Sequence, residues 1–426
     1  MTLILGEGSP QSVIDKNQLD AHLNTFVKHY GNNLKKVLLV PPDFTRFHSG
    51  AGEITVMLYE KLKGKVKIEI LPALGTHVKM SDAELDKMFP GIPHELFLEH
   101  NWRTGIVKIG EIPSSFISDI TGGHLKYSIQ AELSKIMVDG KHDLIISIGQ
   151  VVPHEVVGMA NHNKNIFVGI GGKDIINKSH FIGAVFGMEN IMGRASSPVR
   201  DVFDYAEKHF ASQYKIAYIQ TAVNKGADGK LKMRGIYAGE GKEPFLKAAE
   251  LAVRTNLDLM DKPFKKAVVF LDPSEFKSTW LGNKAVYRTR MAMADKGELI
   301  ILAPGLKEFG EDKEIDRLIR KYGYKGTPAT LKSCDENEEL RSNYSAAAHL
   351  IHGSSEGRFN ITYCPGKLTK EEIESVNFKY ADLKTMTAKY NPEKLKDGYN
   401  TVDGEEIFYI SNPALGLWAL KEKFIK

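Results

Sequence analysis

Cysteine is scarce in this chain of 426 residues. Cys334 and Cys364 are the two present. A disulfide-stabilised scaffold or a cysteine-rich zinc module needs more thiols than this, so both classes are excluded. A chain of this length buries a large apolar core and needs neither device to fold. We therefore expect Cys334 and Cys364 to be free thiols in a reducing compartment.

Long apolar runs and an excess of one charge are also missing. No run approaches the 18–20 apolar residues that span a bilayer. Residues 1–10 lack the basic segment and the apolar segment of a secretory signal. The 57 Lys and Arg against 53 Asp and Glu leave a net charge of +4, which is too weak to indicate nucleic acid or a membrane surface. We expect a cytoplasmic protein.

The common phosphate and nucleophile motifs are absent as well. The sequence contains no G-x-x-x-x-G-K-[ST] loop and no G-x-S-x-G elbow. Gly169-Ile-Gly-Gly172 does not follow the dinucleotide pattern G-x-G-x-x-G. His154 and His162 are eight residues apart, which is not the spacing of a helical zinc pair. Kinases and serine hydrolases therefore lack their signatures here.

What is present is a repeated order of short apolar strand, loop and helix. A capping box at Ser81–Glu84 opens one expected helix, to about residue 89, and others are expected over 51–62 and 243–259. Buried strands are expected at 37–40, 66–71, 144–148, 268–271, 299–302 and 360–363. Short, fully apolar strands that alternate with helices predict mostly parallel α/β sheets covered on both faces.

Asp261-Lys-Pro263 follows the helix at 243–259 and precedes a new strand, which indicates a domain boundary. We predict an N-terminal α/β domain over 1–260 and a C-terminal α/β domain over 261–412. The tail, 413–426, is expected to pack on either domain. The active site is expected in the cleft between the two domains.

Ligands of open α/β sheets lie at the carboxyl ends of strands, so the loops after the expected strands are the candidate sites. The first loop holds Asp43, Thr45 and Arg46, and the second holds His77. The Arg46 guanidinium is suited to a carboxylate because it donates two parallel hydrogen bonds. His77 is suited to acid–base work near neutral pH. A solvated turn and a surface histidine are the alternative interpretations.

The loop region after the third strand is dense in histidine and glycine. It holds His154, Lys164 and, further on, His180. Trp280 and Lys284 follow the fourth strand, where a helix begins. A helix start favours anions, so a carboxylate or phosphate partner is expected there. A charged helix face and a hydrophobic anchor are the alternatives for Lys284 and Trp280.

In this order the loops resemble the nickel-dependent lactate racemase family, whose members racemise or epimerise 2-hydroxy acids. The resemblance spans most of the chain. It rests on Asp43-x-Thr45-Arg46, on Gly75-x-His77 and on the spacing of His154, Lys164 and His180. Lys284 also falls about where the family has the lysine of its second domain.

The resemblance implies a nickel pincer nucleotide, a pyridinium mononucleotide that holds nickel through carbon and sulfur. It implies that Lys164 bonds covalently to this cofactor and that His180 is the protein's nickel ligand. His77 and His154 match the paired acid/base histidines. The remaining matches are Asp43 and Thr45 as cofactor contacts and Arg46, Lys284 and Trp280 as substrate-binding residues.

Two departures from the family pattern bear on the substrate. Asn161-His162-Asn163 stands where the lactate enzyme has a glycine-rich run. Polar residues also follow Trp280, and they include Asn283, Arg288, Arg290 and the segment 354–359. Groups that bind hydroxyls favour a polyhydroxylated substrate, so we favour a sugar acid of the gluconate or mannonate type over lactate. A solvated polar rim is the alternative.

Three other functions stay open. The first is lactate racemisation itself, the second is a nicotinamide-dependent 2-hydroxyacid dehydrogenase, and the third is a non-catalytic protein that binds a sugar acid or nucleotide. The expected partners are a small 2-hydroxy acid and the proteins that make the cofactor. No nucleic acid or membrane partner is expected, and the chain is expected to be a monomer or a homodimer.

Overall fold

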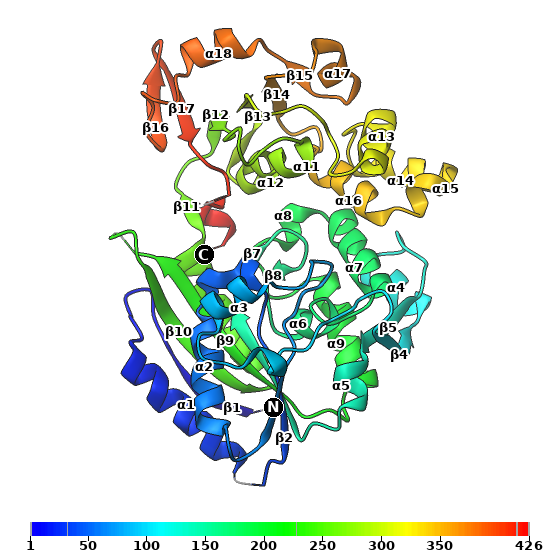
Figure 1. Ribbon diagram of the computed structural model, residues 1–426. Helices are drawn as coiled ribbons and strands as arrows, with labels where there is room; N and C mark the ends of the chain where they lie inside the picture. The colour runs from blue at the N-terminus through cyan, green and yellow to red at the C-terminus, as the bar shows by residue number, and fades with distance from the viewer. Residues whose placement is uncertain (1, 32, 227, 415, 425–426) are drawn as a thin grey trace. The chain divides into compact units, whose positions relative to one another are not determined.

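The chain divides into two compact units. The first comprises residues 1–182 and 190–256, and the second comprises residues 183–189 and 257–426. The computed structural model describes residues 2–31, 33–226, 228–414 and 416–424. Each unit is built on its own six-stranded sheet (Figure 1).

The sheet of the first unit has the order β1-β10-β9-β6-β2-β3. The pairs β2–β3, β2–β6 and β6–β9 are parallel, and β9–β10 and β10–β1 are antiparallel. Its strands are β1 (Thr2–Gly8), β2 (Lys36–Val40), β3 (Lys67–Ile70), β6 (Leu144–Gln150), β9 (Ile216–Lys225) and β10 (Leu231–Glu240).

Further elements of this unit connect and cover the sheet. The short strands are β4 (Ile106–Ile112), β5 (Ile129–Ser134), β7 (Pro153–His154) and β8 (Gly158–Met159). The helices are α1 (Lys16–Tyr30), α2 (Ala51–Leu62), α3 (Asp82–Met88), α4 (Ser114–Ile120), α5 (Lys135–Asp139), α6 (Asn163–Phe167), α9 (Pro198–Phe210) and α10 (Glu243–Asn256), with the 3-10 turns η1 (Phe44–Ser49) and η2 (His94–Leu96). The helices α7 (Lys173–Phe186) and α8 (Met188–Ile191) both include residues of the segment 183–189.

The central strands carry apolar side chains on both faces, and this explains why helices pack on both faces of the sheet. On one face Leu23 of α1 and Leu58 of α2 pack with Leu39 of β2 and Ile146 of β6, and all four are almost fully buried. On the other face α10 packs against β9 and β10. Burial on both faces fixes β2 and β6 in the middle of the unit, so the loops that follow them have rigid anchors.

The sheet of the second unit has the order β15-β14-β13-β12-β17-β16 and is parallel except at β16–β17. Its strands are β12 (Phe264–Phe270), β13 (Met293–Ala303), β14 (Asn360–Pro365), β15 (Lys379–Tyr380), β16 (Gly398–Val402) and β17 (Glu405–Ile410), and β11 (Asp258–Met260) pairs with β18 (Trp418–Leu420). The helices are α11 (Thr279–Gly282), α12 (Lys284–Thr289), α13 (Lys313–Tyr322), α14 (Thr327–Glu336), α15 (Glu338–Arg341), α16 (Tyr344–His352), α17 (Lys370–Ser375) and α18 (Leu383–Lys389), with the turn η3 (Lys421–Lys423).

The expected mixed α/β class with mostly parallel sheets is confirmed. The six expected strands correspond to β2, β3, β6, β12, β13 and β14, and the expected helix at 51–62 is α2. The capping box at Ser81 and Glu84 is formed at the start of α3. The chain passes from the first unit to the second at Asn256–Leu257, and it also passes between them on either side of the segment 183–189. The tail strand β18 lies in the second unit.

The hairpin of β9 and β10 was not predicted. Gln220 and Thr221 interrupt the apolar run of β9, although both are fully buried. The Thr221 hydroxyl donates to the Ser49 carbonyl at 3.0 Å, which makes its burial tolerable. A polar pair in the middle of a strand hides the strand from a reading based on apolar runs.

The structure bears on two features that the sequence has little of, namely cysteines and long apolar runs. Cys334 and Cys364 are both free and buried. None of the helices in the described parts of the chain combines the length and the apolar character that crossing a bilayer requires.

Candidate active site

The loops after β2, β3 and β6 meet at one cavity of the first unit, of about 230 Å³. Because these strands are parallel neighbours, their carboxyl ends lie at the same edge of the sheet. Asn165 of α6 also donates to the Val40 carbonyl and the Ser147 hydroxyl, so it fastens α6 to the ends of β2 and β6. The candidate residues of this unit all line the cavity: Asp43, Thr45, Arg46, His77, His154, Lys164 and His180.

Asp43 and His77 form a hydrogen-bonded pair in this cavity. The Nδ1 of His77 lies 2.6 Å from Oδ2 of the buried Asp43, and the Thr45 hydroxyl donates to Oδ1 at 2.5 Å. Burial raises the pKa of the Asp43 carboxyl, but the hydrogen bonds from His77 and Thr45 outweigh burial and leave the pKa below its ordinary value. The ionised carboxylate therefore favours a proton on Nδ1 of His77, and in the neutral ring this tautomer has its lone pair on Nε2.

His154 has a different environment. It lies on the hairpin of β7 and β8, and its Nδ1 accepts a hydrogen bond from the Val156 backbone N–H at 3.1 Å. Burial lowers the pKa of His154 well below its ordinary value, and the charges of Lys164 and Arg46 act in the same direction. The imidazole is thus neutral, and its proton is on Nε2. His77 offers a base, whereas His154 offers a hydrogen-bond donor.

Lys164 is the second residue of α6 and is half-buried. Burial lowers its pKa to about 8, and the charges of Arg46 and Arg200 add to this effect. An amine with this pKa is partly neutral at physiological pH and is a better nucleophile than a surface lysine.

His180 lies on α7, one wall of the same cavity. Its Nδ1 donates to the Ile176 carbonyl at 2.6 Å, one turn earlier in the helix. Burial lowers the pKa of His180 to about 4, so the ring is neutral and its Nε2 lone pair is available. A neutral imidazole whose other nitrogen donates to a backbone carbonyl is the usual form of a metal-ligating histidine.

The segment between His154 and Lys164 contains two residues in the left-handed backbone region. Asn161 has φ 66° and His162 has φ 59°. This conformation is natural for glycine, and it is costly for a residue with a Cβ. The loop therefore has a glycine-like backbone at two residues that are not glycine.

Arg200 of α9 holds this loop, and the sequence reading missed it. Its guanidinium donates to the carbonyl of Asn161 at 3.0 Å and to Oδ1 of Asn163 at 2.8 Å, and it is fully buried. The available signal was an arginine within the apolar face of α9, three residues before Phe203, because a charge there has to find partners inside the protein.

Asn163 connects Arg200 to two carboxylates. Its Nδ2 donates to Oδ1 of Asp204 at 2.7 Å and to Oε2 of Glu207 at 3.0 Å. Ligand atoms of His162, Asp204 and Glu207 lie within 4.8 Å of one another, which is compatible with a metal ion. Lys242 and Tyr218 donate to the remaining carboxylate oxygens at 2.6 Å each, so these acids are already satisfied and we assign no metal to them.

Trp280 and Lys284, the candidates of the second unit, lie at the starts of α11 and α12. The Trp280 ring packs on His349, with ring centroids 4.4 Å apart. The Lys284 ammonium is 5.7 Å from the Phe276 ring centroid and 4.0 Å from the Glu275 carboxylate.

Several of the polar residues that were expected to bind substrate hydroxyls instead form hydrogen bonds or ion pairs within the second unit. Asn283 is fully buried and accepts from the Tyr363 hydroxyl at 2.8 Å. Arg290 is buried and donates to Glu189, and Arg358 bonds the same carboxylate and Asp295. These side chains stabilise the unit, and they no longer support a choice of substrate.

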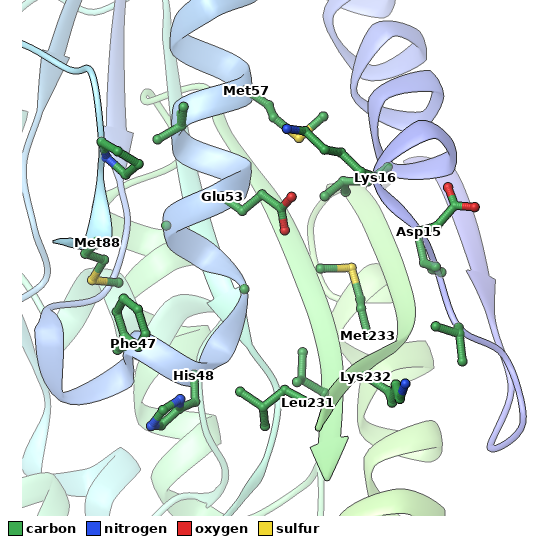
Figure 2. A pocket seen from close by; sticks show the side chains of 18 of the residues that line it. Asp15, Lys16, Phe47, His48, Glu53, Met57, Met88, Leu231, Lys232 and Met233 are labelled. Carbon is green, nitrogen blue, oxygen red and sulfur yellow. The ribbon is translucent and has the colours of Figure 1, made fainter. Parts of the chain in front are cut away.

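A larger cavity of the first unit, about 550 Å³, is lined by the other side of η1 (Figure 2). Figure 2 shows Met57 and Glu53 on α2 and Met233 on β10 around it. Most of its lining is apolar, and none of the candidate site residues belongs to it. Its size alone does not make it the site of chemistry, because the groups that could transfer protons gather in the smaller cavity.

The chain is similar in sequence to known proteins over part of its length. The family model of the lactate racemase N-terminal domain matches residues 9–192. A lactate racemase from Thermoanaerobacterium thermosaccharolyticum is 25% identical over 225 residues, which are 51% of this chain and 47% of that protein. The sequence match thus spans about half the length of the curated relative.

Two solved structures show the same fold. A crystal structure of a protein from Thermotoga maritima has a TM-score of 0.75 at 24% identity and covers 97% of this chain and 100% of its own. The lactate racemase apoprotein from T. thermosaccharolyticum has a TM-score of 0.67 at 17% identity, with 91% of this chain and 87% of its own covered.

The lowered pKa of Lys164 makes a direct prediction. The amine should become reactive toward acetic anhydride as the pH rises through about 8, because the neutral form then becomes dominant. Pulse acylation of the chain at pH 6–11, followed by peptide mass spectrometry, measures the midpoint. The exposed Lys265 serves as the internal control for the reagent. A midpoint for Lys164 at 10 or above would contradict the assigned environment.

Proposed function

Because residues 9–192 match the model of the lactate racemase N-terminal domain, we propose that the chain is a racemase or epimerase that inverts C2 of a 2-hydroxy acid. The observation that supports this most is that one cavity holds the Asp43–His77 pair, the neutral His154, Lys164 with its lowered pKa, and His180. Of the two ring nitrogens of His180, Nδ1 is bonded to the Ile176 carbonyl. These are the groups to which the resemblance assigns roles in such a reaction.

The residues fit a nickel pincer nucleotide. His180 presents an Nε2 lone pair, and a neutral imidazole suits a nickel ion that is otherwise held by soft donors. Lys164 presents an amine that is partly neutral and able to form a covalent bond. When bound, the cofactor would accept the C2 hydride and return it to the other face of the planar 2-oxo acid, and this return inverts C2. Loading it requires the proteins that make it, which are the expected partners of this chain.

His77 is the proton carrier of the proposed reaction. Its Nε2 accepts the proton of the C2 hydroxyl, and the Asp43 carboxylate stabilises the imidazolium that forms. Asp43 thus acts through His77, which differs from the cofactor contact implied by the resemblance. Thr45 keeps the carboxylate oriented by donating to its second oxygen.

His154 has the complementary role. With Nδ1 engaged by the Val156 N–H and a strongly lowered pKa, it donates its Nε2–H to the C2 oxygen and stays neutral. This polarises the carbon–oxygen bond of the planar 2-oxo state. Arg46, exposed at the cavity, is suited to pair with the substrate carboxylate and to pre-orient the acid. Lys284 and Trp280 remain proposed substrate contacts of the second unit.

We propose a sugar acid of the gluconate or mannonate type as the substrate. Asn161 supports this choice, because its side chain lines the cavity in the segment where the resemblance implies a glycine-rich run in the lactate enzyme. Asn161 is 8% exposed, and neither Oδ1 nor Nδ2 has a hydrogen-bond partner in the described structure. A buried donor and acceptor without partners favour a ligand that carries hydroxyl groups.

The proposed activity predicts inversion without exchange. Cofactor-loaded protein should invert C2 of at least one acid in a panel of lactate, gluconate and mannonate in deuterated water. Proton NMR should detect no solvent deuterium at C2, because the hydride returns internally. Deuterium at C2 would show instead that C2 is inverted by abstraction of its proton. Net formation of the 2-oxo acid with a nicotinamide cofactor would instead indicate a dehydrogenase.

The unequal environments of the two histidines predict unequal losses. His77→Gln should lower kcat by about 10³-fold, because glutamine has no basic nitrogen to accept the hydroxyl proton. His154→Gln should lower kcat by only about 10-fold, because its amide still donates a hydrogen bond. Steady-state kinetics of both loaded variants test the assignment. Equal losses would show that both histidines transfer protons.

Asn161→Gly should separate the two candidate substrate types. It should lower kcat/KM for gluconate at least 10-fold and change that for lactate less than about threefold, because only the sugar acid has further hydroxyls for the amide to bind. The backbone should be unaffected, since φ 66° suits glycine. Parallel losses for both acids would refute a role of Asn161 in specificity.

A further inference from the structure

Arg200 is a buried charge whose position demands an explanation. It is fully buried on α9, and no described carboxylate pairs with it directly. Burial lowers its pKa to about 10, which reflects the cost of keeping the charge inside the protein. A buried charge of this kind is explained by the groups that its hydrogen bonds hold in place.

Those hydrogen bonds are all made to one short segment. The Arg200 guanidinium donates to the carbonyls of Met159 and Asn161 and to Oδ1 of Asn163. It grips both ends of the segment 159–163, and the two left-handed residues lie within this segment. Backbone carbonyls in an irregular buried loop have no ladder partner, so a fork of donors satisfies them.

The guanidinium group of Arg200 and its partner Asn163 have further contacts that hold them in place. The Phe245 ring lies 4.3 Å from its guanidinium carbon, and Asn163 links it to the carboxylates of Asp204 and Glu207. His162 adds a second anchor, because its Nε2–H donates to the Gly241 carbonyl at 3.0 Å. The loop is therefore held from α9 and from the segment before α10, and it leads directly into Lys164 of α6.

We propose that Arg200 is a positioning residue for Lys164. Its clamp keeps the 159–163 loop in the left-handed conformation that glycine would adopt unaided, and so directs the Lys164 amine to the cavity. The functional part rests on the proposed attachment of the cofactor at Lys164. Lysine at position 200 would keep the charge, but a single ammonium does not present a planar fork to these acceptors.

The clamp can be tested without cofactor. In Arg200→Lys, amide hydrogen exchange of the full chain should become at least 10-fold faster in peptides covering 158–168. Exchange in β2 and β6 should stay within twofold. The matched control is Arg254→Lys, an exposed arginine of α10 in the same unit, which should match the unaltered chain throughout. Unchanged exchange in 158–168, or uniform acceleration across the unit, would overturn the proposal.

A second variant covers the case in which Arg200→Lys does not fold. Asn163→Ala removes one acceptor of the guanidinium and leaves Arg200 in place, so exchange in 158–168 should rise about threefold. No change in 158–168 in this variant would again overturn the clamp.

The functional arm uses protein made in cells that synthesise the cofactor. Intact mass should show at least a fivefold smaller fraction of Arg200→Lys chains with an adduct at Lys164, while turnover per adduct-bearing chain stays within threefold. An unchanged adduct fraction would refute the positioning role. If the unaltered chain carries no adduct, the proposed attachment fails, and the exchange measurement still decides whether Arg200 holds the loop.

Discussion

The parallel pairing of β3, β2 and β6 is the constraint on which the site depends. It brings three loops that are far apart in sequence to one edge of the sheet. The strands are apolar on both faces and covered by helices, so the edge is rigid. Hydrogen bonds between the loops then adjust their positions, such as the Gly75 N–H to the Gly169 carbonyl at 2.8 Å. Loss of this pairing would separate His77 from Asp43 and leave no cavity.

Desolvation sets the protonation states in this cavity. It lowers the pKa values of Lys164, His154 and His180, since each would carry a positive charge when protonated. Desolvation alone would raise the pKa of Asp43, but the hydrogen bonds from His77 and Thr45 outweigh it and keep the carboxyl ionised. One buried environment thus yields a carboxylate, neutral imidazoles and a partly neutral amine, and this division of states makes distinct chemical roles possible.

The sequence predicted six strands of the two sheets and the polar loops that line the cavity, and its failures have specific causes. The apolar strands and the polar loops after them were readable because both follow local rules of pattern and position. The strand β9 was not predicted, because Gln220 and Thr221 are polar although they are buried. Arg290 and Arg358 were assigned to a substrate, but Glu189 binds both, and its distance in sequence exceeds the reach of a local pattern. Partners of a buried charge become visible only when tertiary contacts are known.

Asn161 shows how a tertiary partner changes the cost of a local feature. Read alone, a residue with a Cβ at φ 66° weakens the loop, and its unpaired amide weakens it again. Arg200 offsets the first cost by satisfying the carbonyls of the loop. Nothing within the described structure offsets the second, because the amide has no partner there. A residue that breaks two local rules at the wall of a cavity is most simply explained by a ligand that supplies the missing hydrogen bonds.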